Sequence, residues 1–184
     1  DKSIDFILAD LPYGTTRNNW DKSLDLGKLW VQYERVIKDN GCIALWAQSP
    51  FDKILACSNL KLYRYEWIVQ KTHPTGFLNA KKMPMKAHEN VLIFYKKLPT
   101  YNPQKTFGHP RKASTAWHKR NCKVTSNYGE HGLTTYDSTE RYPIDVLRFK
   151  WDTQKSKGHP TQKPVEANEY FIDRKSTRLN SSHW

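Results

Sequence analysis

Short, continuous apolar runs, separated by stretches with helical spacing, constrain the fold of this chain more than any other feature. Four runs are interpreted as buried strands: 4–9 (IDFILA), 42–47 (CIALWA), 65–70 (YEWIVQ) and 90–95 (NVLIFY). A strand that is apolar throughout is typical of a sheet covered on both faces. Helical spacing in 26–37, ended by Asn40-Gly41, and a short helix opened by Ser49-Pro50 lie between them. This alternating order predicts an open α/β sheet.

The character of the sequence changes after Lys97. Residues from Leu98 onward are rich in Pro, Asn, Gly, Lys and Thr without a sustained period, and hydrophobicity returns weakly at 142–149 (YPIDVLRF). A helix is expected after Pro164. The last twelve residues, DRKSTRLNSSHW, are polar, and we interpret them as a disordered or foreign tail outside the fold. The chain is thus divided into 1–97, an insertion at 98–141, a return to the sheet at 142–172, and a tail at 173–184.

The net charge of +12 and the sequence pI of about 9.6 indicate a polyanionic partner. Between Lys71 and Val124 there are twelve Lys or Arg residues and one acid, Glu89, with aromatic residues among the charges. Cations that hold phosphates, mixed with rings that stack on bases, are typical of nucleic-acid surfaces. The alternative is a solvated basic face with no partner.

Membrane and metal-binding classes find no support in the sequence. No stretch approaches the ~20 apolar residues of a membrane span, and no signal peptide precedes the first strand. The cysteines Cys42, Cys57 and Cys122 are odd in number and lack metal-type spacing. We therefore expect reduced thiols in a cytoplasmic protein, and no metal site.

Asp10-Leu11-Pro12-Tyr13 follows the first predicted strand directly. In open α/β sheets, ligands bind beyond the carboxyl ends of the strands, so this tetrapeptide marks a candidate site. A structural alternative is an aspartate that caps a helix, beside a packed tyrosine.

Three segments taken together carry a family resemblance. They are DLPYG at 10–14, WIVQKTHPTGFLNAKKMPMKAHENVLIFYKK at 67–97, and HPTQKP at 159–164. In this order they resemble the amino-group DNA methyltransferases, which methylate adenine N6 or cytosine N4 with S-adenosylmethionine, over residues 1–172. Leu11 replaces the proline more common in that family, and the acid at Asp10 is similar to the adenine-type members. The resemblance implies a partial Rossmann-like methyltransferase sheet with an irregular basic insertion.

The chemistry of methylating an amino group gives these residues roles. The lone pair of an exocyclic amino nitrogen is delocalised into the ring, so two acceptors aimed at its N–H bonds favour a pyramidal, nucleophilic nitrogen. Asp10 supplies a carboxylate oxygen and Pro12 a carbonyl oxygen, as preorganised acceptors rather than a proton relay. Tyr13 stacks on a target base turned out of the duplex.

The resemblance also implies contacts with the cofactor S-adenosylmethionine. Asp10, Thr161 and Lys163 are expected near its methionine end, although HPTQKP also fits a simple proline-bounded helix start. His88-Glu89 is interpreted as a buried structural pair rather than a catalytic one. None of the eight glycines forms Gly-x-Gly after an apolar strand. We therefore expect a fragment that binds the cofactor weakly or not at all, with unpaired sheet edges and poor stability.

The expected partner is double-stranded DNA with a flipped target base. The insertion is expected to recognise the target sequence, and candidate phosphate contacts come from Lys81, Lys82, Lys86, Arg111, Lys112, Lys119 and Arg120. The leading prediction is part of a prokaryotic or phage adenine N6 methyltransferase, for example from a restriction-modification system. The alternatives are a cytosine N4 methyltransferase and a non-catalytic nucleic-acid-binding module.

Overall fold

The computed structural model describes residues 1–14, 24–116, 136–150 and 162–175. The chain forms two compact units, one from Asp1–Asn102 with Ile144–Trp184 and a smaller one from Pro103–Pro143. The second unit covers most of the insertion that the sequence places at 98–141. Its role in target recognition stays a prediction.

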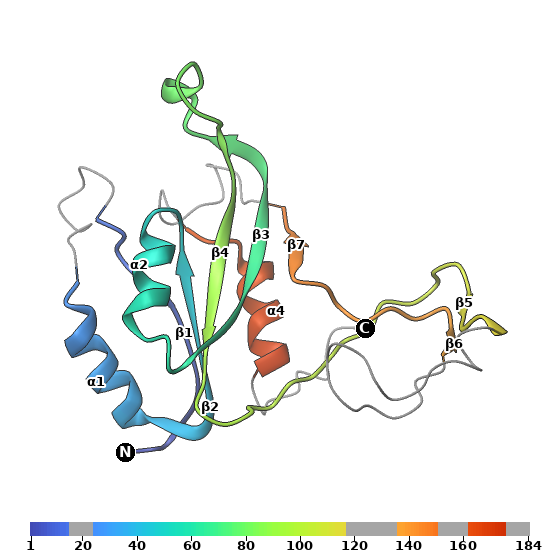
Figure 1. Cartoon of the computed structure of the whole chain (residues 1–184), viewed down its shortest axis with the longest axis horizontal. Helices are drawn as coiled ribbons and strands as arrows, with labels where there is room; N and C mark the ends of the chain where they lie inside the picture. Colours follow the sequence, from blue (N-terminus) through green and yellow to red (C-terminus); the bar gives the residue numbers. More distant parts are fainter. Residues whose placement is uncertain (15–23, 117–135, 151–161, 176–184) are drawn as a thin grey trace. The chain divides into compact units, whose positions relative to one another are not determined.

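The larger unit contains a five-stranded sheet in the order β1-β2-β4-β3-β7 (Figure 1). Strand β2 is parallel to β1 and antiparallel to β4, while β3 is antiparallel to β4 and parallel to β7. The strands are β1 (Ile4–Asp10), β2 (Ile37–Ala47), β3 (Tyr63–Thr75), β4 (Lys86–Phe94) and β7 (Val146–Arg148). Four strands therefore end at the same edge of the sheet as Asp10, and β4 begins there.

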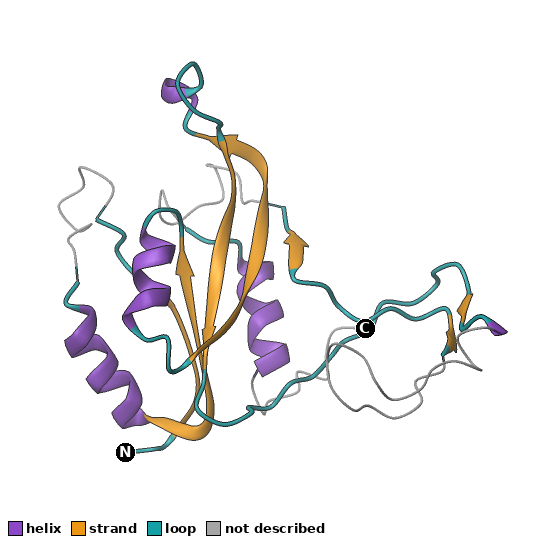
Figure 2. Ribbon diagram, in the orientation of Figure 1, coloured by secondary structure: helices purple, strands orange, loops and turns teal. Residues whose placement is uncertain are grey.

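Helices cover both faces of this sheet (Figure 2). They are α1 (Leu26–Val36), α2 (Phe51–Ser58) and α4 (Val165–Lys175), with a short 3₁₀ turn, η1 (Phe77–Asn79), after β3. Alternate residues of each strand face opposite layers. In β2, Ile43 and Leu45 pack in the core with α1 and α2, whereas Ala44 and Trp46 pack in the core with α4. This double burial explains the uninterrupted apolar runs and confirms the α/β class.

The strands are longer than their apolar runs predict. Helix α1 ends at Val36, and β2 begins at Ile37, which pairs with Ile4, instead of after Asn40-Gly41. At the other end, β3 and β4 continue together as far as the pair of Thr75 with Lys86. Backbone pairing extends these strands through segments whose side chains are mostly polar, so hydrophobicity alone misses the extensions.

Helix α4 continues past the boundary that the sequence suggests at residue 172. Arg174 and Lys175 lie in its last turn and are buried. Lys175 Nζ lies 4.7 Å from the ring centre of Tyr101 and 5.4 Å from that of Tyr65. Cation–π contacts of this kind favour a buried ammonium group, which explains why a polar sequence stays helical here. Residues 176–184 lie outside the described residues.

The smaller unit is held together by short ladders and ion pairs. Strands β5 (Lys112–Ala113) and β6 (Asp137–Ser138) are antiparallel, and Thr106 bridges to Arg141. Arg111 binds both carboxylate oxygens of Asp137, at 2.7 and 2.5 Å.

In the described part of the chain, no helix is both long enough and apolar enough to cross a membrane.

Candidate active site

Three strands each place one charged side chain on the α4 face of the sheet, at the carboxyl edge where Asp10 lies. Leu8 of β1, Trp46 of β2, Val69 of β3 and Val91 of β4 all pack in the α4-side core. Because side chains alternate along a strand, residues two positions along from Leu8, Val69 and Val91 share that face. These residues are Asp10, Lys71 and Glu89.

Asp10 ends β1 with a partly exposed carboxylate, since 38% of its side chain is accessible. Its Oδ1 accepts a hydrogen bond from the Tyr13 hydroxyl at 3.0 Å and lies 3.4 Å from Lys163 Nζ. Burial raises the pKa of Asp10, while Lys163 and the Tyr13 hydrogen bond oppose that rise. In the described residues no helix begins directly after Asp10, so Asp10 is not a helix cap.

Lys163 lies just before α4, and its ammonium group is the centre of the cluster. Its Nζ contacts Glu89 Oε2 at 2.5 Å and the Tyr13 hydroxyl at 3.0 Å, in addition to Asp10. The ring centres of Tyr13 and Trp46 lie 5.1 and 5.3 Å from Nζ. An ammonium group has three N–H donors, and three oxygen atoms surround this one.

Glu89 is buried between two lysines. Its Oε1 lies 2.8 Å from Lys71 Nζ, and its Oε2 lies 2.5 Å from Lys163 Nζ. Burial by itself raises the pKa of Glu89, but the attraction of Lys163 and Lys71 outweighs it and holds this pKa below its ordinary value of 4.5. The ionised carboxylate therefore anchors both lysines.

Tyr13 joins this cluster to the opposite side of the sheet. Its ring stacks on Phe51 of α2, with centroids 5.4 Å apart and planes at 24°, while its hydroxyl contacts Asp10 and Lys163. Gly14 follows with a φ of 64°, a conformation that favours glycine. The turn thus directs Tyr13 back over the end of the sheet.

His88 and Glu89 do not form the buried pair that the sequence suggests. Glu89 is buried, whereas His88 is exposed, because adjacent strand residues face opposite sides of the sheet. Lys71 has no predicted role from the sequence alone. The period-two pattern that runs through Val69 and Val91 is the signal that could have found Lys71 and Glu89 together.

The candidate DNA contacts divide into several environments. Lys81 and Lys82 are exposed beyond the end of β3. Lys86 donates to the carbonyl oxygen of Ser49 at 2.9 Å, and Arg111 is bound to Asp137. Lys112 is exposed in β5. Lys119, Arg120 and the cofactor candidate Thr161 lie outside the described residues.

Many cations of the basic segment are paired with acids. Lys71 is paired with Glu89 inside the segment, and Arg111 with Asp137 outside it. Lys96 and Lys97 lie within 4.0 Å of Asp39, and Lys105 lies 2.7 Å from Glu140, both acids again from elsewhere in the chain. Among the described residues of this segment, those with no acidic partner that is itself described are Lys81, Lys82, Lys86 and Lys112. Fewer cations of this segment are therefore left without an acidic partner than the sequence alone suggests.

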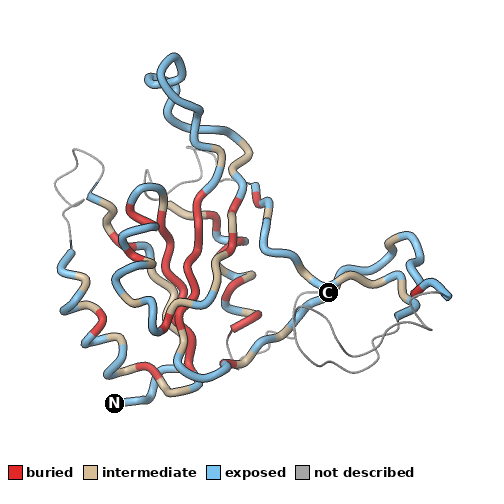
Figure 3. Tube along the Cα trace, viewed as in Figure 1, coloured by how far each residue is buried: buried red, intermediate tan, exposed pale blue. Residues whose placement is uncertain are grey.

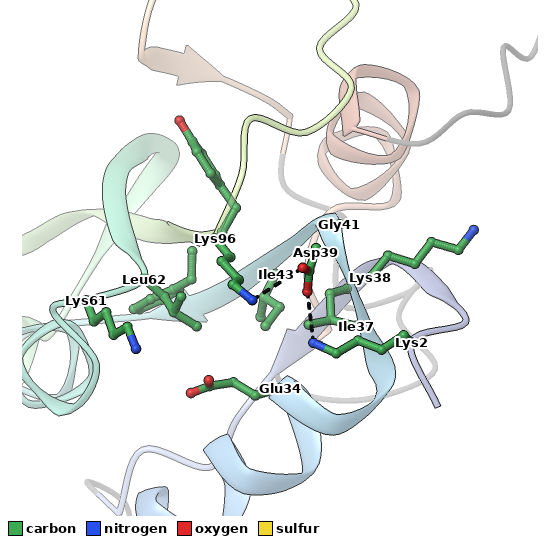
Figure 4. A pocket seen from close by; sticks show the side chains of 12 residues that line it. Lys2, Glu34, Ile37, Lys38, Asp39, Gly41, Ile43, Lys61, Leu62 and Lys96 are labelled. Carbon is green, nitrogen blue, oxygen red and sulfur yellow. Dashed lines mark hydrogen bonds and ion pairs between the residues drawn. The ribbon is translucent and has the colours of Figure 1, made fainter.

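A small pocket of about 120 Å³ lies at the opposite end of the sheet from Asp10 (Figure 4). Its lining includes Ile37, Gly41 and Phe94, together with charged residues, several of which are paired. Asp39, for example, accepts from Lys2 at 3.1 Å and from Lys96 at 3.3 Å. Because it lies at the opposite end of the sheet from Asp10, this pocket is not a candidate for the chemistry.

Two solved DNA methyltransferases share the fold. A complex of M1.HpyAVI with SAM (S-adenosylmethionine) has a TM-score of 0.54 at 18% identity, covering 94% of this chain and 67% of that one. The cytosine-N4-specific PvuII DNA methyltransferase has a TM-score of 0.55 at 12% identity, covering 96% of this chain and 64% of that one. This chain thus spans about two thirds of each solved chain. No curated protein sequence matches it.

The family comparison covers nearly the whole sequence. The DNA methylase family of N6 and N4 methyltransferases matches residues 4–181. The match includes the Asp10 turn, both strands that supply Lys71 and Glu89, and the segment of Lys163. These features confirm the resemblance seen in the sequence: the chain belongs to the DNA methylase family of N6 and N4 methyltransferases.

Proposed function

We propose that this chain carries the target-base half of a DNA methyltransferase that acts on adenine N6. The observation that carries the proposal is the partly exposed carboxylate of Asp10, fixed at the carboxyl edge of the sheet by Tyr13 and Lys163. Ligands of open α/β sheets bind at this edge. An acid at the position of Asp10 supports adenine over cytosine as the target.

Asp10 and Pro12 act as hydrogen-bond acceptors for the amino group of the target base. A carboxylate oxygen and a carbonyl oxygen that each accept one N–H bond keep the nitrogen lone pair out of the ring and available for attack. S-adenosylmethionine supplies the methyl group, on a sulfonium centre. Asp10 must be ionised to accept, so Lys163, which opposes the rise in the pKa of Asp10, supports the active form.

Tyr13 is the proposed stacking partner of the target base. Its ring is already stacked on Phe51, and its hydroxyl is tied to Asp10 and Lys163. A ring held in this way is a rigid platform for a base flipped out of double-stranded DNA. Flipping is required because the amino group is otherwise paired inside the duplex.

Lys163 is proposed as a positioning residue rather than a direct ligand of the cofactor. Its three donors face Glu89, Tyr13 and Asp10, so a cofactor carboxylate would have to displace one of them. Asp10, with its partly exposed oxygens, is the better candidate for contact with the cofactor. The chain has no Gly-x-Gly turn after a strand. We therefore propose that this chain by itself binds S-adenosylmethionine weakly and is inactive.

The first test is methyl transfer by the full open reading frame that contains this chain, with enzymatic digestion of the product DNA to nucleosides. N6-methyladenine is the expected product, and N4-methylcytosine contradicts the adenine assignment. Asp10→Ala should lower the rate by at least about 10²–10³-fold, the usual cost of removing one preorganised polar group, and leave DNA affinity unchanged. If Asp10→Ala changes no activity, the chain is instead a non-catalytic binding module.

Cofactor binding is tested separately by calorimetric titration of S-adenosylmethionine into this chain and into the full open reading frame. Tight binding by this chain alone would contradict the proposed inactivity. It would also show that the pocket is built without a glycine-rich turn.

A further inference from the structure

Strands β3 and β4 leave the sheet together as an arm, which comprises residues 71–89 (Figure 1). Strand β7 pairs with β3 only as far as Gln70, and β2 pairs with β4 only as far as Asn90. Within the residues that the structure describes, the two strands pair only with each other beyond these points. Because Ala47, next to the partner of Asp10, pairs with Asn90, the arm rises from the edge that carries the candidate site.

The tip of the arm, residues 76–85, is exposed throughout (Figure 3). Large apolar side chains are among its exposed groups. Leu78 is 95% exposed and Phe77 is 78% exposed, while Met83 and Met85 are 54% and 37% exposed. Solvent-exposed apolar groups that gather on one projection are typical of interaction sites.

The backbone of the tip is an ordered set of turns. The Asn79 amide donates to the Gly76 carbonyl, the Ala80 amide to Phe77, and the Met83 amide to Asn79. Gly76 has a φ of 92°, which makes the reversal after β3 possible. Phe77 and Leu78 are therefore presented on a short 3₁₀ turn rather than collapsed onto the sheet.

The charge around these apolar groups selects a partner. Residues 71–88 contain four lysines and no Asp or Glu. Lys81 and Lys82 are exposed at the tip itself. An apolar projection flanked by cations fits a polyanion whose interior is apolar and stacked, which is the chemistry of a nucleic-acid duplex.

The length of the arm also fits this partner. The five steps from Gln70 to Thr75 span roughly 16 Å at about 3.3 Å per residue. The major groove of DNA is about 12 Å wide, so the tip reaches across a groove while Asp10 stays at the edge of the sheet.

We propose that the arm tip is a wedge that enters the duplex, with Phe77 and Leu78 inserted at an unstacked base step and Lys81 and Lys82 on the flanking phosphates. The inference rests on the proposed action on DNA and adds a second contact point to it. Apolar wedges open base steps in other DNA-binding proteins. Here the wedge lowers the cost of turning a base out toward Asp10.

The test measures binding of this chain to two short fluorescein-labelled duplexes, one fully paired and one with a central mispair, over a range of salt concentrations. A mispaired step costs less to unstack, so the chain should prefer that duplex. Phe77→Ala with Leu78→Ala should lower affinity for the mispaired duplex about tenfold, the scale of losing one aromatic–base contact, without changing the salt dependence.

Lys81→Gln with Lys82→Gln should have the complementary effect. The slope of log K against log salt should become shallower by about 1.8 on both duplexes, because two phosphate contacts are lost. Leu60→Ala is the matched control, since Leu60 is 65% exposed and precedes the opposite end of β3. It should change neither quantity.

The outcomes separate the wedge from the proposed function. If the Phe77 and Leu78 variant keeps its full affinity for both duplexes, the wedge is overturned and the methyltransferase proposal stands. If the unmodified chain binds neither duplex at low salt, the proposed DNA substrate fails as well. Binding to anionic lipid vesicles that depends on Phe77 and Leu78, with DNA binding unaffected by them, also overturns the wedge.

Discussion

The two ends of the β3–β4 arm use lysine in opposite ways. At the root, Lys71 is 8% exposed and bound to the buried carboxylate of Glu89. At the tip, Lys81 and Lys82 are exposed beside Phe77 and Leu78. Folded proteins usually bury apolar groups and expose charged ones. The root instead buries charged groups, and the tip exposes apolar groups. The root is therefore organised inward, around the buried carboxylate of Glu89, whereas the tip is exposed in the way that the proposed contact with DNA requires.

The largest effect that sharpens this contrast is expected from Glu89→Gln. It leaves the ammonium groups of Lys71 and Lys163, both under 10% exposed, without their shared anion. Breaking one side of a buried ion pair costs about 3–5 kcal/mol of unfolding free energy. Urea denaturation measures this cost, with Lys82→Gln at the tip as the control that should change little. A loss below about 1 kcal/mol, the scale of exposed pairs, would contradict the buried character of the root.

The next effect concerns the charge state of Asp10. Lys163→Met removes the cation that opposes the rise in the pKa of Asp10, so this pKa rises further. Because the proposed mechanism needs Asp10 as a carboxylate, the acid limb of the pH–rate profile of the full open reading frame should move to higher pH. Lys163→Arg keeps the charge, so the acid limb should stay close to its position in the enzyme without substitutions. An unmoved limb in Lys163→Met would show that Lys163 does not act through Asp10.

A smaller effect is expected in the acid stability of the chain. The pKa of Glu89 is lowered on folding, so Glu89 contributes stability above its ordinary value of 4.5, and this is lost as pH falls through the folded pKa. Asp10 has a raised pKa and contributes with the opposite sign. Unfolding measured against pH should therefore be less acid-sensitive in Glu89→Gln and more acid-sensitive in Asp10→Asn. The reverse order would contradict the ion-pair assignment.

The smallest effect is expected at the tip. Phe77→Ala with Leu78→Ala should change the unfolding free energy by no more than about 0.5 kcal/mol, as surface substitutions usually do. Thermal unfolding checks this against the chain without substitutions. A loss of several kcal/mol would mean that the tip packs inward, which removes the contrast with the root.

Much of the fold could be predicted because strands that are buried on both faces have continuous apolar runs in the sequence. The runs at 42–47 and 90–95 are almost entirely apolar, since both sides of β2 and β4 are covered. The turn of Asp10 and Tyr13 could be found because it follows such a run directly. The position of Asp10 at the end of a strand could be predicted from the motif that follows that strand, while its role there stays a prediction.

The ion pairs could not be predicted in the same way. Glu89 and Lys163 are far apart in sequence, and their contact depends on how β4 and the start of α4 meet. The pairing of Lys96 with Asp39 and of Lys105 with Glu140 likewise joins distant residues. Counting charges along the chain treats all lysines alike, whereas folding neutralises some and leaves Lys81 and Lys82 exposed.

Strand β1, which ends in Asp10, pairs with β2 but with no other strand in the described residues. Opening a strand held on one side breaks fewer hydrogen bonds than opening β2 or β4, which are held on both. In deuterated water, the amides of β1 should therefore exchange by local opening sooner than those of β2. Since Asp10 moves with its strand, gentle warming should break the contacts of Asp10 with Tyr13 and Lys163 while the rest of the sheet is still folded. The lifetime of the site is then set by the fraying of one strand rather than by unfolding of the whole domain.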